Sequence, residues 1–157
     1  MSNNLITGFL TTAACVALQC VVVSLLLRSL VALQRTRSFR LTIPVASVML
    51  TSVLLVMLAG NLLQIALWAG VFILYGEFQD FATAFYHSTV NFSTLGYGDI
   101  VLSKERRLLS GLEALNGVLM LGLTSSIMFA VLHAMAGYAR AERERRDRGP
   151  GAPEDIS

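Results

Sequence analysis

Charged residues are scarce in this sequence. They make up 14% of the 157 residues, whereas 55% are hydrophobic, and a soluble domain of this length usually carries about 25% charged residues. Apolar runs of about 18 or more residues are candidate membrane spans. The composition therefore argues against an ordinary soluble domain and predicts an integral membrane protein.

Cysteine is also scarce. Cys15 and Cys20 lie within one apolar run and have neither metal-ligand nor disulfide spacing. Free cysteine is commonly buried, so we expect two buried thiols. Residues 1–30 lack the basic start of a secretory signal, and their apolar stretch is too long for one. This segment is therefore predicted to be a retained span.

Several functional classes lack the residues that they need. The sequence shows no nucleophile–base pair and no metal-ligand cluster, so no enzyme is predicted. Voltage sensors carry regularly spaced arginines within a span, and the arginines after the first apolar run do not have that spacing. About 20 residues follow the last apolar run, too few for a cytoplasmic ligand-binding domain. A secondary transporter is disfavoured because no inverted repeats are present.

Three apolar runs are each predicted to form a membrane-spanning helix. The first covers about residues 5–27. The second begins at Pro44, since proline is tolerated in the first helical turn, and ends near Tyr75. The third covers residues 108–138. These runs predict an all-α membrane protein with three transmembrane helices per chain.

Arginines gather at two places in the chain. One group lies between the first two runs and the other follows the third run: Arg28, Arg35, Arg37 and Arg40, then Arg140, Arg143, Arg145, Arg146 and Arg148. The positive-inside rule places both groups in the cytoplasm and the N-terminus outside, although Lys104, Arg106 and Arg107 oppose it. We expect a plasma (inner) membrane protein with a cytoplasmic C-terminus. The basic loop and tail either bind anionic lipid headgroups or only set the topology.

The loop between the second and third runs has two unlike parts. Residues 78–91 are too few to cross a bilayer but long enough for a short helix, and Asp80 near its start favours the positive end of the helix dipole. Residues 93–100, STLGYGDI, are poor in helix formers. Irregular backbone at membrane depth must be shielded by protein or line water. Together these parts predict a re-entrant loop on the outer side.

Gly96 and Gly98 explain what the irregular part can do. Glycine adopts backbone angles that are closed to other residues, so successive carbonyl oxygens of this segment can point the same way. Four or five extended residues give a column roughly 13–16 Å long. Where several copies meet around an axis, their carbonyls form oxygen rings that replace the water shell of a monovalent cation. The segment therefore predicts an ion pathway lined by backbone oxygens.

The segment Thr94-Leu95-Gly96-Tyr97-Gly98-Asp99 resembles the selectivity filter of potassium channels. The resemblance extends over residues 44–138, with an outer helix (44–75), a pore helix (78–91), the filter (94–99) and an inner helix (108–138). Residues 1–43 would then be an additional N-terminal helix with a basic loop, and residues 139–157 a basic tail. The resemblance implies a tetrameric channel, a homotetramer in the lipid bilayer that conducts K⁺ passively. Permeant K⁺ is expected, with no organic cofactor and no nucleic acid partner.

The resemblance also assigns roles within the filter. The hydroxyl and carbonyl of Thr94 would close its inner end, and the carbonyls of Leu95, Gly96 and Tyr97 would form the K⁺ sites above it. The Tyr97 ring would pack sideways against the pore helix and hold the filter width. Asp99 would attract cations at the outer mouth and hydrogen-bond behind the filter. Related nonselective channels carry aspartate in place of this tyrosine, which favours potassium selectivity.

The pore helix departs from the family pattern at three positions. Val90 stands where some members carry a glutamate that pairs with the filter aspartate, and Tyr86 and His87 stand where others carry two tryptophans. Within the filter, Leu95 replaces the more usual valine or isoleucine. These changes concern the stability of the conducting filter and leave its carbonyl ligands in place.

The third run suggests a cavity and a gate below the filter. Residues three and four apart share a helix face, and one such stripe is predicted to line the cavity: Leu123, Ser126, Ala130 and Ala134. The constriction is predicted over residues 134–138, which end at Tyr138. Ser126 is either a polar wall group or a hydroxyl that bonds back to its own helix. Gly117 and Gly122 are either hinges or sites of close helix packing. Glu113 and Asn116 are either sensors or hydrogen-bonding supports for the filter.

Two other functions remain open on the sequence alone. One is a nonselective cation channel, and the other is a non-conducting accessory or scaffold subunit of a membrane complex. Ion flux through the purified protein discriminates among the three.

Overall fold

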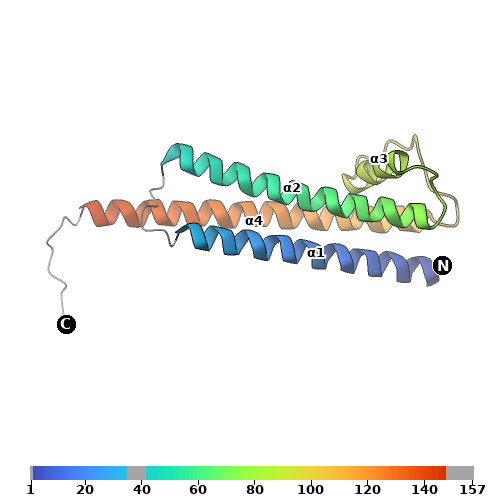
Figure 1. Ribbon diagram of the computed structural model, residues 1–157, viewed down its shortest axis with the longest axis horizontal. Coiled ribbons are helices and arrows are strands. Elements are labelled where there is room, and N and C mark those ends of the chain that lie inside the picture. Colours follow the sequence, from blue (N-terminus) through green and yellow to red (C-terminus); the bar gives the residue numbers. More distant parts are fainter. Residues whose placement is uncertain (1, 35–41, 148–157) are drawn as a thin grey trace.

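The computed structural model describes residues 2–34 and 42–147. Within these residues the elements are α1 (Ser2–Gln34), α2 (Ile43–Leu74), α3 (Phe81–Phe92) and α4 (Arg107–Asp147). Figure 1 shows α1, α2 and α4 lying lengthwise side by side, with the short α3 at the same end as the N-terminus. The described elements are all helical, so the predicted all-α fold is confirmed.

The three long helices coincide with the three predicted spans. Ser2–Ala32, Pro44–Leu74 and Arg107–Ala141 are each long and apolar enough to cross a membrane. Helix α1 is longer than predicted at both ends, and α4 continues as helix to Asp147 in the region predicted to be a tail. The arginines at positions 35, 37, 40 and 148 lie outside the described residues.

Helix α3 begins three residues later than predicted. Asp80 is its N-cap, and the Asp80 carboxylate accepts a hydrogen bond from the Thr83 backbone N–H at 2.8 Å. An N-cap side chain satisfies one of the otherwise unpaired N–H groups of the first turn. This hydrogen bond also lowers the pKa of Asp80. Asp80 therefore acts as the cap that starts the helix, and the residues before it lie outside the helix.

Helix α1 is joined to α2 by buried polar groups. The amide of Gln64 donates a hydrogen bond to Gln19 at 2.8 Å, and both side chains are fully buried. The hydroxyls of Thr7 and Tyr75 also form a hydrogen bond between these helices. Polar contacts between transmembrane helices each contribute about 1 kcal/mol to their association. Helix α1 is therefore packed specifically into the bundle.

The thiols of α1 have different surroundings. Cys15 is fully buried, as predicted, whereas Cys20 is exposed. The prediction for Cys20 was wrong because that residue lies on the face of α1 turned away from α2 and α4. A small apolar side chain such as cysteine suits a surface that faces lipid as well as it suits a buried position.

The main core lies where α2, α3 and α4 meet. Trp68 and Phe72 of α2 pack in one cluster with Phe92 of α3 and with Leu109 and Met120 of α4. Among the described helices, α1 contacts α2 and α4 but not α3. In Figure 1, α1 and α3 lie on opposite sides of α4. The core therefore fixes α3 against α2 and α4 on the side away from α1.

The loop between α3 and α4 contains a paired arginine. Arg106 lies 3.2 Å from the Glu77 carboxylate, and its guanidinium lies over the Tyr75 ring, 3.9 Å from the ring centre. Glu77 also accepts hydrogen bonds from the backbone N–H and the hydroxyl of Ser103. Cation–π and carboxylate partners compensate the guanidinium charge. Arg106 is thus part of a structural cluster.

Candidate functional site

The segment that follows α3 is hydrogen-bonded to the end of that helix. The Val90 carbonyl accepts hydrogen bonds from the backbone N–H groups of Leu95, at 3.0 Å, and of Gly96, at 3.2 Å. The Asn91 carbonyl accepts one from Thr94 at 2.8 Å. Carbonyls in the last turn of a helix lack partners within the helix. Here the next three residues supply those partners, so the N–H side of the segment faces α3.

Left-handed residues alternate along the same segment. Thr94, Gly96 and Gly98 have φ values of 60°, 57° and 74°, while the φ of Leu95 and of Tyr97 is not positive. Alternating handedness turns successive N–H groups toward one side of the chain. Because those N–H groups face α3, we infer that the carbonyl oxygens face the other way. Residues 93–99 are all exposed in the single chain, so the described part of the chain leaves this segment uncovered.

Thr94 holds a strained conformation at the inner end of the segment. A positive φ costs a residue with a side chain about 1–2 kcal/mol. This conformation is rare for a β-branched residue such as threonine. The Thr94 hydroxyl donates a hydrogen bond to the Ser93 carbonyl at 2.6 Å. Strained residues that persist are concentrated at functional sites. The strain at Thr94 therefore supports a role for this segment beyond connecting two helices.

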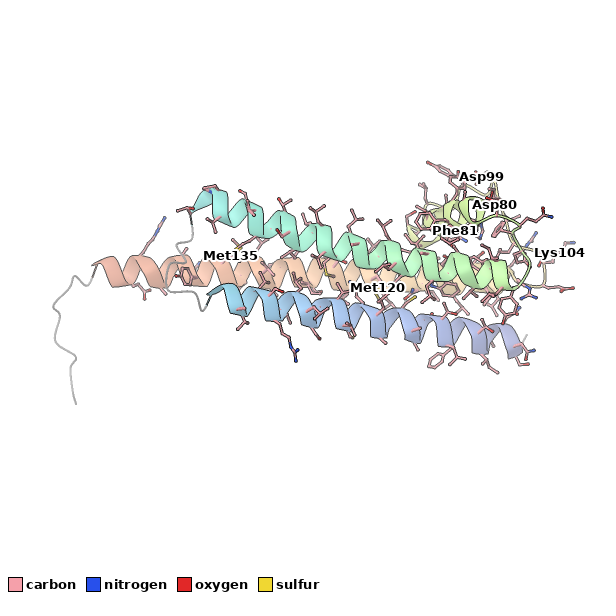
Figure 2. All side chains as sticks on the ribbon, viewed as in Figure 1. Asp80, Phe81, Asp99, Lys104, Met120 and Met135 are labelled. Carbon is pink, nitrogen blue, oxygen red and sulfur yellow. The ribbon has the colours of Figure 1, made fainter. Side chains whose placement is uncertain are left out.

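The outer end of the segment is tied to α3 through Asp99. The Tyr86 hydroxyl donates a hydrogen bond to the Asp99 carboxylate at 2.8 Å, as the resemblance predicts for a group behind the filter. This hydrogen bond lowers the pKa of Asp99 and raises the pKa of Tyr86. Figure 2 shows Asp99 at the same end of the molecule as Asp80 and Lys104.

The Tyr97 ring does not have the packing predicted for it within one chain. Its side chain is 66% exposed, so the α3 helix of the same chain does not bury it. Alternation along the segment turns this ring to the outside of the molecule. The predicted packing of Tyr97 therefore requires a pore helix from another copy.

His87 makes a second connection between α3 and the outer end of the segment. The Asn91 side-chain amide lies 2.8 Å from Nε2 of His87, and Nδ1 lies 3.1 Å from the Ile100 carbonyl. Since the amide donates, Nε2 is the acceptor and Nδ1–H donates to Ile100. Burial lowers the pKa of His87 below its usual value. The imidazole is therefore neutral near pH 7 and holds the Ile100 backbone in place.

This arrangement predicts a loss of stability in mild acid. The pKa of His87 is lower in the folded protein than its ordinary value of 6.5, so the unfolded chain binds the proton first and stability falls as pH falls below about 6.5. We expect the unfolding temperature in detergent to decrease between about pH 6.5 and 5.5. His87→Gln, which can donate and accept without titrating, should lack this decrease. Equal decreases in both proteins would contradict the assignment.

Gly117 of α4 lies directly against the end of α3. A Cβ atom at this position would overlap the Phe92 carbonyl oxygen, whereas a Cβ at Gly122 would meet nothing within 4 Å. Small residues let helices approach closely in membranes. Of the two alternatives for Gly117, the structure supports close packing. The contact fixes the position along α4 of residues 93–99, which we call the filter segment after the resemblance.

The cavity stripe on α4 stays a prediction, and the structure places it partly beside α1. Leu123 packs against the main core, and Ala130 and Ala134 line a groove of about 320 Å³ together with residues of α1. The Ser126 hydroxyl bonds back to the Gly122 carbonyl at 2.9 Å. Ser126, Ala130 and Ala134 are exposed, so α1 borders this face of α4 and does not cover it. Tyr138 lies further along α4 and is partly buried.

A different face of α4 is open. Four residues spaced three or four apart are exposed, beginning one position after Gly117: Val118, Leu121, Ser125 and Phe129. Such spacing places them on one side of a helix. Because Gly117 contacts the end of α3, this stripe starts beside the filter segment. Spacing alone did not reveal it, since both stripes have helical periodicity and only the position of α1 separates them.

Glu113 and Asn116 lie in the buried interface between α3 and α4. Both are fully buried, and the Asn91 amide donates a hydrogen bond to the Glu113 carboxylate at 3.3 Å. The sequence left Glu113 as either a sensor or a hydrogen-bonding group behind the filter, and the structure favours the hydrogen-bonding group.

Comparison with known proteins gives one match. Residues 60–134 match a family model described as "Ion channel". The match supports an ion channel. It spans part of α2, all of α3, the filter segment and most of α4, so it contains every element of the site described above and leaves out α1. No curated protein and no solved structure matches the chain.

Proposed function

We propose that this protein is a potassium-selective channel in which four copies surround one pore. The observation that carries the proposal is the filter segment itself. The N–H groups of residues 94–96 bond to the end of α3, the φ angles alternate in sign, and residues 93–99 are exposed, from which we infer that the carbonyl oxygens face away from α3. Rings of such oxygens substitute for the water shell of K⁺. The K⁺ ligands in this proposal are the main-chain oxygens of Thr94, Leu95, Gly96 and Tyr97.

The surface of the single chain supports assembly around an axis. Leu95 and Tyr97 are 55% and 66% exposed beside the filter carbonyls. One chain supplies one filter segment, and a ring of ligands needs several segments related by cyclic symmetry. Exposed apolar side chains next to polar oxygens fit a surface that other copies cover. The bilayer surrounds the assembly, with the N-terminus outside and the arginine-rich loop and tail in the cytoplasm beside anionic lipid headgroups.

The exposed stripe of α4 forms the wall of the pore below the filter in this proposal. Val118 and Leu121 lie nearest to the end of α3, and Phe129 lies furthest from it. The carbonyl end of α3 carries the negative end of the helix dipole, which favours a cation below the filter. Ser125 is the polar group of this wall, and its hydroxyl also bonds to the Leu121 carbonyl at 3.0 Å.

Cysteine accessibility tests which face of α4 lines the pore. In a Cys20→Ala background, Ser125→Cys should react with a charged thiol reagent and lose K⁺ flux about tenfold, because the modified side chain obstructs a water-filled pore. Ala130→Cys is the matched control, since it lies in the groove beside α1. We expect its flux to change less than twofold in the same assay. Equal block of both variants would contradict the assigned face.

Ion flux tests the proposed function as a whole. Purified protein in liposomes should conduct K⁺ and should pass Na⁺ at least tenfold more slowly. Equal K⁺ and Na⁺ flux would favour a nonselective cation channel. A folded tetramer that never conducts would favour an accessory subunit.

A further inference from the structure

Glu113 is a carboxyl group buried among uncharged neighbours. It is 0% exposed on the face of α4 that packs against α3. Its nearest polar groups on α3 are the Asn91 amide and the Ser88 hydroxyl. No salt bridge to Glu113 forms within residues 2–34 and 42–147. An ionised carboxylate in such surroundings carries a large desolvation cost, which neutral hydrogen-bond donors such as Asn91 offset only in part.

The hydrogen-bonding groups around Glu113 suit a neutral carboxylic acid. Oε2 accepts a hydrogen bond from Asn91, while Oε1 of Glu113 and Oγ of Ser88 are both buried without a hydrogen-bond partner. A proton on Oε1 can be donated to Oγ of Ser88, which would satisfy both atoms. Without that proton, the Ser88 hydroxyl can itself donate to Oε1, but the negative charge then stays buried without a cationic partner among the described residues. Buried polar groups in folded proteins are almost always paired.

Glu113 is also connected to the outer end of the filter. The Asn91 amide has two N–H groups, and it lies 2.8 Å from Nε2 of His87 and 3.3 Å from Oε2 of Glu113. His87 in turn donates to the Ile100 carbonyl, next to Asp99 of the filter. The Ser110 hydroxyl of α4 lies 3.3 Å from the same His87 nitrogen. A continuous set of hydrogen bonds therefore runs from α4 to the backbone at the filter exit.

We propose that Glu113, as a neutral carboxylic acid, positions the outer end of the filter through Asn91 and His87, and that loss of its proton weakens this hold. Glu113 is a positioning residue because it does not touch the ion pathway. The proposal rests on the proposed channel function for its effect on conduction. Its statement about the proton does not depend on conduction.

Each helix around Glu113 contributes few other titratable groups. From α1, the Cys15 thiol faces Glu113. From α3, His87 is linked to it through Asn91, and from α2 the neighbouring core side chains, Trp68 and Phe72, do not titrate. Protonation of His87 affects the protein only at acidic pH, where Nε2 gains a proton and can no longer accept the hydrogen bond from Asn91. An alkaline effect therefore reports on Glu113 or Cys15, and Cys15→Ala separates the two.

Infrared spectroscopy tests the proton directly. The spectrum of the wild-type protein minus that of Glu113→Gln should contain the carbonyl band of a protonated carboxylic acid at pH 7. Glu105→Gln is the matched control, since Glu105 lies on the exposed outer loop, and its difference spectrum should show the band of an ionised carboxylate. A carboxylate band for Glu113 at pH 7 would overturn the proposal, whether or not the protein conducts.

Flux across a pH series tests the positioning role. K⁺ flux of the wild type and of Cys15→Ala and Glu105→Gln should fall severalfold as the pH is raised from 7 to 9.5, whereas Glu113→Gln should show no fall because its amide cannot ionise. Asn91→Leu breaks the connection and should reduce flux at every pH without an alkaline fall. The proposal is wrong if Glu113→Gln keeps the wild-type alkaline profile. Absence of flux in every protein, with the acid band present, would count against the channel function and against the positioning role, but not against the proton on Glu113.

Discussion

Replacing Gly117 with alanine is expected to abolish K⁺ flux and to lower the unfolding temperature of the protein. The new methyl group would overlap the Phe92 carbonyl oxygen, which belongs to backbone and cannot rotate away as a side chain could. Overpacking typically costs about 1–3 kcal/mol. Phe92 ends α3, so relief of the overlap moves the helix that carries the filter. Flux in liposomes and thermal unfolding in detergent measure the two effects.

Gly122→Ala is the matched control for this substitution. It lies on the same helix, and its new methyl group would meet nothing within 4 Å. Alanine also favours the helix by about 1 kcal/mol over glycine. The control should therefore keep flux within about twofold of the wild type. If Gly117→Ala conducts and unfolds like this control, α3 does not approach α4 as closely as described.

Replacing Gly96 with alanine is expected to reduce K⁺ flux at least tenfold and to remove the preference for K⁺ over Na⁺. Gly96 has a φ of 57°, which costs alanine about 1–2 kcal/mol in each chain. A new Cβ meets nothing within 4 Å in the single chain, so the penalty is conformational. The strain is relieved when the peptide group turns, and a turned peptide group removes one oxygen ligand from the column.

Gly76→Ala imposes similar strain outside the filter. Gly76 has a φ of 73° and open space around its Cβ position, and it follows α2 in the outer loop. We expect this variant to lose some stability and to keep its ion selectivity. Selectivity measured from bi-ionic potentials separates the two variants. Equal loss of selectivity in both would show that positive-φ strain in general, and not the filter oxygens, accounts for the effect.

The sequence predicted the parts of this fold that depend on local composition. Long apolar runs identify α1, α2 and α4 because the hydrophobic effect acts on average composition. The filter segment is equally local, since the conformations of Gly96 and Gly98 follow from the absence of a side chain. The capping role of Asp80 could be predicted from the sequence, because an aspartate before a helix often accepts a hydrogen bond from the backbone N–H three residues later, here that of Thr83. The predicted start at residue 78 overlooked this cap.

The parts that were missed depend on contacts between distant segments. Two stripes of α4 have helical spacing, and only the docking of α1 shows that the one containing Ala130 borders a groove beside α1. The exposure of Cys20 depends on the same docking. The role of Gly117 was left open because periodicity does not reveal which neighbour approaches a glycine. The connection from Glu113 to His87 joins residues that lie 26 positions apart through Asn91, and no local motif marks it.

The most direct test of the account is the reversal potential of the purified protein in a planar bilayer, with K⁺ on one side and Na⁺ on the other. If carbonyl oxygens of residues 94–97 from four chains replace the water around K⁺, the potential should lie close to that of a membrane permeable to K⁺ alone. A potential near zero would mean that Na⁺ passes as readily as K⁺. That result would contradict the central claim.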